Sequence, residues 1–120
     1  YGYLQKKMKN TLQAVSNHKY SNILKNFGKS DITYNINFNL FNNSLKRFTN
    51  LKTLITNQRD FLLRMGIIER AEIISKNLSF TKKADVFYRL KRLIDINQMG
   101  KLFKVMLIVN KYRKFKVGFN

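Results

Sequence analysis

The sequence predicts an α/β fold, and three observations favour it. Alternate residues from Ile32 to Phe38 are apolar, as in a half-buried strand. In later segments apolar residues recur at three- and four-residue spacing, as they do on one face of a helix. Residues 102–109 are almost continuously apolar, which suits a strand inside a sheet.

The first thirty residues are expected to hold short strands and a loop. Tyr1-Gly2-Tyr3 reads as the end of a strand, and residues 11–15 form a second short strand. Residues 17–30 are polar and contain Gly28, so we expect an irregular loop there.

A helix is predicted directly after the alternating segment. Its apolar positions are spaced 3-4-3, and Asn37 can cap its first turn because its side-chain oxygen accepts a backbone N–H. The apolar positions are Phe38, Phe41, Leu45 and Phe48.

The second half is expected to hold a strand over Leu51–Ile55, three helices and a final strand over Leu102–Val109. Thr56 or Asn57 can cap the first of these helices. Gly66 can end that helix, since glycine tolerates the left-handed conformation. The second helix follows at once, the third opens at Thr81 with the apolar residues Val86, Phe87, Leu90, Leu93 and Ile94 facing inward, and Asp95–Gly100 is a turn.

The net charge of +18, from 24 Lys and Arg against 6 Asp and Glu, suggests a nucleic-acid partner. The same charge fits compositional drift, since residues of A/T-rich codons dominate and Lys outnumbers Arg 17 to 7 although Arg is the better phosphate ligand. The basic residues are also scattered along the chain. We therefore expect no specific nucleic-acid partner.

The residue types alone give little evidence for a catalytic or a metal site. The chain has no Cys, and one His with six acids provides no metal-ligand cluster. His18 lies in a predicted loop, where we expect its side chain to be exposed to solvent rather than catalytic. The sequence therefore identifies no catalytic residue. The five glycines are too far apart for a phosphate-binding G-x-G loop. Tyr1-Gly2-Tyr3 is the exception, because a glycine at a strand end lets the backbone approach a ligand closely.

Five segments, in order, carry a family pattern. They are YGY at 1–3, NTLQAVSNHKY at 10–20, GKSDITYNINF at 28–38, TNQRDFLLRMGIIERAE at 56–72 and QMGKLFKVMLI at 98–108. Together they resemble the C-terminal third of the MidA-type S-adenosylmethionine-dependent methyltransferases.

The resemblance implies the C-terminal portion of a class I, Rossmann-like methyltransferase fold, with an incomplete sheet and several helices. It implies that an intact parent uses S-adenosylmethionine to methylate an arginine of a protein substrate. Mitochondrial relatives act in this way on a respiratory complex I subunit and assist assembly of that complex. The location would be cytoplasmic in a bacterium and mitochondrial in a eukaryote, and no membrane span is expected.

The resemblance also assigns candidate residues. Tyr1, Gly2 and Tyr3 would lie at the cofactor or substrate cleft. The substrate side would be shaped by Thr11, Gln13, His18, Asp31 and Thr33. Further matches look structural, and they are Gln58, Phe61, Gly66, Met99, Gly100, Phe103 and Lys104.

Departures from the pattern limit what this chain can do alone. Asn35 and Asn37 stand where the family has His and Asp, and Asn35 cannot serve as a general base. Gln58-Arg59 replaces the family's Gln-Gly. The glycine-rich cofactor loop and the acidic ribose-binding residue would belong to a missing N-terminal half. We therefore expect residues 1–109 to be part of a methyltransferase domain that is inactive alone, followed by a basic tail over 110–120. A small basic nucleic-acid-binding module and a decayed gene product remain the alternatives.

Overall fold

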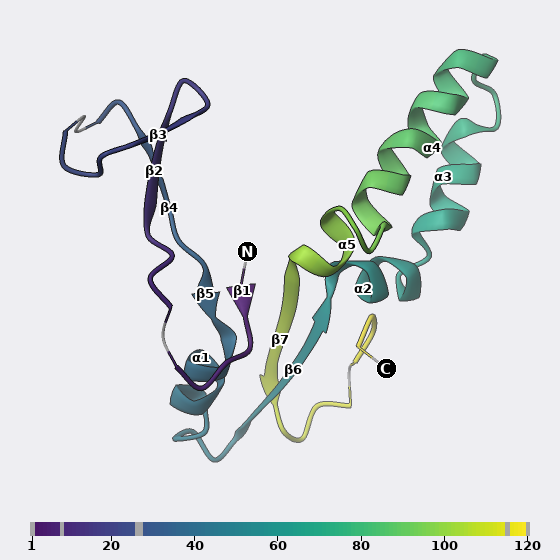
Figure 1. Cartoon of the computed structure of the whole chain (residues 1–120). Helices are drawn as coiled ribbons and strands as arrows, with labels where there is room; N and C mark the ends of the chain where they lie inside the picture. Colours follow the sequence, from purple (N-terminus) through teal and green to yellow (C-terminus); the bar gives the residue numbers. More distant parts are fainter. Residues whose placement is uncertain (1, 8, 26–27, 115, 120) are drawn as a thin grey trace. The chain divides into compact units, whose positions relative to one another are not determined.

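The computed structural model describes residues 2–7, 9–25, 28–114 and 116–119. The chain divides into two compact units, Tyr1–Ser44 and Leu45–Asn120 (Figure 1). Each unit mixes short strands with helix, so the predicted α/β class is confirmed for both. The predicted boundary near residue 109 stays a prediction.

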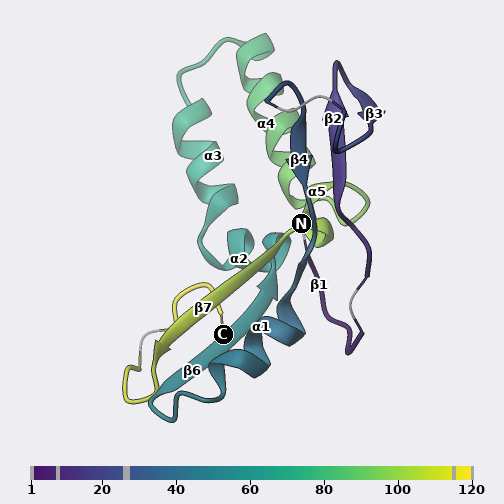
Figure 2. The same ribbon diagram turned by 90° about the vertical axis from the view of Figure 1, so that its left-hand side faces the viewer.

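The described residues of the first unit form two small sheets and one helix. In one sheet β1 (Gly2–Tyr3) pairs in parallel with β5 (Ile36–Asn37). The other sheet is antiparallel, with the order β3-β2-β4 (Figure 2). Its strands are β2 (Gln13–Ser16), β3 (Lys19–Ser21) and β4 (Asp31–Thr33). Ala14, on the central strand, is buried.

The prediction of an irregular loop over residues 17–30 is wrong at its start. Asn17 and His18 both have positive φ, 49° and 60°, as the two central residues of a tight hairpin turn require. The chain therefore folds back, and β3 pairs with β2 through Tyr20 opposite Val15. The strand escaped prediction because it lies at a polar sheet edge, where Tyr20 is 80% exposed.

The predicted strand over 32–38 is also corrected. It is split between two sheets: β4 pairs with β2, and β5 pairs with β1. Between them the backbone N–H of Asn35 donates to Thr11 Oγ1 at 3.0 Å, so this residue does not extend either ladder. The burial expected from the alternation is not observed either, since Ile32, Tyr34 and Ile36 are exposed and Asn37 is buried. A period-2 pattern also cannot reveal a break between the two pieces.

The first helix begins where it was predicted. Asn37 Oδ1 accepts the backbone N–H groups of Asn39 (3.1 Å) and Leu40 (3.2 Å), which caps α1 (Phe38–Leu45). Phe38 is buried, whereas Phe41 is exposed and Phe48 lies beyond the helix. Within the described part of the chain, the predicted apolar face is thus buried only at Phe38 and half-buried at Leu45.

The second unit is built on a long antiparallel pair. β6 (Leu51–Asn57) and β7 (Lys104–Asn110) match residue for residue from Leu51↔Asn110 to Asn57↔Lys104. The final strand therefore begins two residues later than predicted, because Leu102 still belongs to a short helix. In the described residues β7 pairs with β6 alone, so the interior position expected for it in a wider sheet is not observed.

Four helices separate these strands, in the order α2 (Gln58–Arg64), α3 (Ile67–Ser75), α4 (Phe80–Ile94) and α5 (Met99–Leu102). Gly66, at φ 74°, separates α2 from α3 as predicted. α4 begins at Phe80, one residue earlier than predicted, and the expected turn over 95–100 gives way to α5 at Met99. Along the described chain, none of the helices combines the length and apolar character that crossing a membrane requires.

The Asn57 cap gives a direct test of the second unit. Its side chain accepts the Asp60 N–H at 2.8 Å and donates to the Asp60 carboxylate at 2.7 Å. We expect Asn57→Ala to lower the free energy of unfolding by about 1 kcal/mol, because the α2 amino end loses its cap. Urea denaturation measures the change. Asn57→Ser, which keeps an acceptor, should recover most of the loss, and an equal loss in both variants would contradict the capping role.

Candidate functional site

The first unit contains a cavity of about 520 Å³ that is open to solvent. It lies among β1, β5, the first turns of α1 and the segment at residues 9–12. Apolar and aromatic side chains make up much of its wall, with several amides and hydroxyls between them. The lining residues are Tyr3, Lys9, Asn10, Thr11, Leu12, Tyr34, Asn35, Ile36, Asn37, Leu40, Phe41 and Ser44.

Tyr3 is held in place on two sides. Its hydroxyl accepts the backbone N–H of Lys9 at 2.8 Å. The Lys9 ammonium lies 5.9 Å from the centre of the Tyr3 ring, within cation–π range. The segment after β1 is therefore folded back over the tyrosine, which fixes one wall of the cavity.

Asn37 supplies a polar group to another wall. Its oxygen is committed to the α1 cap, which orients the amide. Only 7% of the residue is exposed, and within the described structure its Nδ2 has no hydrogen-bond partner. A buried donor without a partner is costly. Since Nδ2 is itself closed to solvent, a ligand group could accept from it only after neighbouring side chains moved.

Gly2 is fixed by packing against Phe38. A Cβ at this position would lie 2.1 Å from Phe38 Cε2 and 2.9 Å from the Ile36 carbonyl oxygen. Only glycine lets β1 and the phenylalanine approach this closely. The structure thus gives the glycine of Tyr1-Gly2-Tyr3 a packing role, while its approach to a ligand stays a prediction.

The predicted site residues fall into two groups. Tyr3 and Thr11 line the cavity, and Gly2 lies directly behind it. The others belong to the β3-β2-β4 sheet: Gln13 faces Thr33 across the β2–β4 pair, and Asp31 lies opposite Val15. His18 is exposed in the β2–β3 turn. Tyr1 lies outside the described residues.

Apart from Tyr3 and Thr11, the cavity residues were not assigned to a site from the sequence, and Lys9, Asn35 and Asn37 show why. Lys9 lies in a polar stretch that carries no pattern, and Asn35 and Asn37 were read only as departures from the family and as a cap. The cap signal at Asn37 was the one available clue, since a capping side chain has a second polar atom that needs a partner.

Gln58 and Arg59, in the second unit, act on the carboxyl end of α4. Gln58 Nε2 donates to the Leu93 carbonyl and Arg59 Nη1 to the Ile94 carbonyl, each at 2.8 Å. These bonds satisfy carbonyl groups that have no partner within the helix. The structural role expected for Gln58 is confirmed, and Arg59, where the family has glycine, shares it.

Gly100 is also structural, as expected. A Cβ there would lie 2.5 Å from the Ile94 carbonyl oxygen, and the Gly100 N–H donates to the Asp95 carbonyl at 2.9 Å. Phe61 packs edge-on against Phe119, with ring centres 5.4 Å apart.

Comparison with known proteins supports the predicted resemblance. Residues 1–57 match a family described as "Putative S-adenosyl-L-methionine-dependent methyltransferase". The matched segment contains every lining residue of the cavity.

Solved structures extend the likeness to the rest of the fold. A COG1565 superfamily protein from Burkholderia thailandensis superposes on the whole chain with a TM-score of 0.76 at 21% identity. A second member from the same organism, bound to S-adenosyl-homocysteine, covers 92% of the chain with a TM-score of 0.64 at 24% identity. The chain spans 32% and 27% of these two proteins, so it has the fold of about one third of each.

The cavity residues alone do not make a complete S-adenosylmethionine site. Asp31 is the one acid in residues 1–44, and it lies exposed on β4 rather than in the cavity wall. The cavity therefore offers no carboxylate for ribose hydroxyls, and the sequence has no glycine-rich loop for the rest of the molecule.

The contact between Gly2 and Phe38 can be tested by a double-mutant cycle. We expect Gly2→Ala to destabilise the chain by about 1–3 kcal/mol, because the new methyl group overlaps the ring. Phe38→Leu removes the overlapping atoms, so the double variant should lose less than the sum of the two single variants. Urea denaturation of the four proteins measures the coupling. Strict additivity would show that the glycine is needed for another reason.

Proposed function

We propose that this chain forms the C-terminal third of an S-adenosylmethionine-dependent methyltransferase. One observation carries the proposal: the first 57 residues match the family described as "Putative S-adenosyl-L-methionine-dependent methyltransferase". The fold supports it, since the chain superposes along its whole length on a COG1565 superfamily protein, and another COG1565 member is described as a likely methyl transferase bound to S-adenosyl-homocysteine. In this proposal the remainder of the enzyme supplies the cofactor loop and the acidic ribose ligand, and this third supplies part of the cleft.

We further propose a protein arginine as the methyl acceptor. Three aromatic side chains, Tyr3, Tyr34 and Phe41, line the cavity of the first unit. A guanidinium group is planar and weakly hydrated and stacks on aromatic faces, so this lining suits arginine better than a compact ammonium group. The amide and hydroxyl groups of Asn35 and Ser44 are available there as acceptors for its N–H groups.

The biological setting follows from the same proposal. A substrate among the subunits of respiratory complex I, and a role in assembling it, would agree with the mitochondrial relatives that the motifs resemble. The two solved structures come from a bacterium, and for a bacterial parent enzyme we propose the cytoplasm.

Cofactor binding provides the test. We expect no saturable heat when S-adenosylmethionine is titrated into the 120-residue chain, because the chain lacks the glycine-rich loop and the ribose ligand. The intact product of the surrounding open reading frame should bind one equivalent and methylate an arginine peptide, but not its lysine counterpart.

The two titrations separate the parts of the proposal. One-to-one binding by the 120-residue chain would refute its dependence on the remainder of the enzyme. An intact product that neither binds the cofactor nor methylates either peptide would refute the methyltransferase assignment. Methylation of the lysine peptide alone would refute arginine as the acceptor.

A further inference from the structure

A groove runs along one side of the helical hairpin formed by α3 and α4. It consists of two hollows that share Phe87. The hollow toward the far end of the hairpin, about 450 Å³, is bordered by Ile73, Lys76 and Lys83. The hollow at the base, about 520 Å³, is bordered by Ile68, Leu90 and Lys91 among others. Since residues four apart lie on one helix face, positions 83, 87 and 91 line the groove as a continuous row.

The floor of the groove is apolar and partly open to solvent. Leu90 is buried, whereas Ile68, Ile73 and Ile96 are exposed, Ile73 to 74%. These isoleucines border the hollows rather than standing singly on the surface. Contiguous exposed apolar side chains with a polar rim are typical of an interaction surface.

Cations form most of the rim. Lys76 and Lys83 stand at one hollow and Arg59 and Lys91 at the other, against the two acids Glu72 and Asp95. The ion pair seen among the described residues of α4, Asp85 with Arg89 at 2.9 Å, involves neither of the groove lysines of that helix. Residues 45–120 as a whole carry 18 Lys and Arg against 5 Asp and Glu.

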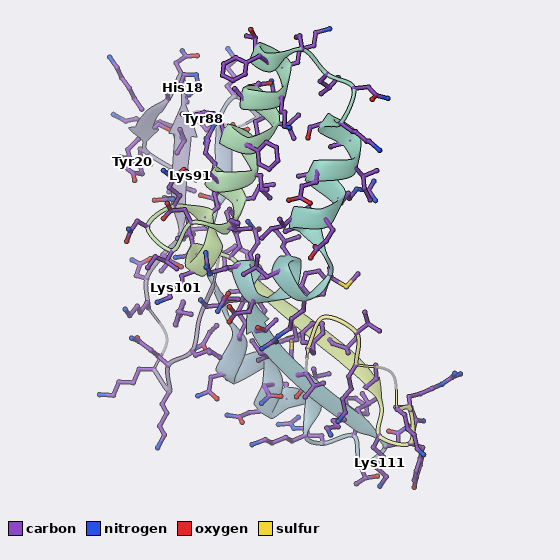
Figure 3. The ribbon with its side chains drawn as sticks, turned by 90° about the vertical axis from the view of Figure 1, so that its right-hand side faces the viewer. His18, Tyr20, Tyr88, Lys91, Lys101 and Lys111 are labelled. Carbon is purple, nitrogen blue, oxygen red and sulfur yellow. The ribbon has the colours of Figure 1, made fainter. Side chains whose placement is uncertain are left out.

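We propose that this groove docks an acidic amphipathic segment of a partner protein. The apolar face of the segment would cover Ile68, Ile73 and Phe87, and its carboxylates would pair with Lys83 and Lys91. These lysines are eight residues apart on α4, or ~12 Å at 1.5 Å per residue. Carboxylates about two helical turns apart on a partner helix match that distance. Figure 3 shows the side chains of the hairpin, with Lys91 and Tyr88 labelled on α4.

Other occupants fit the groove less well. Single-stranded nucleic acids bind through aromatic platforms and arginine forks. Among the described residues that line the groove, Phe87 is the one aromatic side chain on an otherwise aliphatic floor, and three of the four rim cations are lysines. A second copy of this chain would bring the same positive surface to the interface, so like charges would oppose its docking.

The test measures peptide binding by fluorescence anisotropy with the whole 120-residue chain. The probe is a fluorescein-labelled 16-residue helical peptide with leucines along one face and glutamates seven residues apart. A matched peptide carries lysines in place of the glutamates. We expect the glutamate peptide to bind, and the double variant Lys83→Glu/Lys91→Glu to weaken it about ten-fold or more while strengthening the lysine peptide.

Matched variants distinguish binding in the groove from non-specific electrostatic attraction between the peptide and the positively charged chain. Lys101→Glu changes one charge on α5 outside the groove, and Tyr88→Ala removes a ring from α4 outside it; both should change the dissociation constant less than about two-fold. Ile73→Ser should weaken binding, since the apolar contact is lost. Circular dichroism checks that every variant keeps its helices.

Four results would overturn the proposal. They are failure of the glutamate peptide to bind, equal binding of the two peptides, an equal loss in Lys101→Glu, and displacement of the peptide by oligo(dT), which would favour nucleic acid. Sedimentation showing a dimer that Ile73→Ser dissociates would assign the groove to a second copy. None of these measurements involves S-adenosylmethionine, so their failure leaves the methyltransferase proposal standing.

Discussion

The second unit depends on one three-residue junction, Asn57-Gln58-Arg59, where β6 ends and α2 begins. Asn57 caps α2, and the next two side chains hold the carboxyl end of α4, thirty-five residues further along the chain. The Gln58 N–H also donates to the Phe103 carbonyl at 3.0 Å, just before β7 begins. One short segment therefore fixes the end of a strand, the start of a helix and the position of a second helix. Displacing it would leave buried carbonyl groups unsatisfied at several places at once.

Local signals in the sequence predicted the helix boundaries well. Asn37, Asn57 and Gly66 mark boundaries through their own side chains or backbone, so each could be recognised within a few residues. The partners of Gln58 and Arg59 could not be recognised, because they lie far along the chain. The strand β3 was missed for a different reason: it is a polar edge strand, held by a turn at Asn17 and His18. These two residue types adopt positive φ more readily than most, but no glycine marks the turn.

The sequence predicted the candidate site only in part, again because the deciding contacts join residues that lie far apart along the chain. The family motif identified Tyr3 and Thr11, which line the cavity, but motif order alone could not separate them from Gln13, Asp31 and Thr33 on a neighbouring sheet. That separation depends on the break between β4 and β5. A single hydrogen bond from Asn35 to Thr11 occupies this break, and nothing in the alternation of residues 32–38 reveals it.

The net charge and the amide side chains indicate a function only once the positions of these residues in the structure are known. Asn37 keeps the helix cap of an aspartate, yet it leaves one buried N–H donor without a partner in the described structure. An aspartate would place a second acceptor at this buried point instead of a donor, so the two residues differ in the hydrogen-bond partner that they need there. In the same way, a net charge of +18 says little by itself. Four cations around an aliphatic groove on α3 and α4 define a much narrower class of partner, because the apolar floor and the spacing of the charges must both be matched.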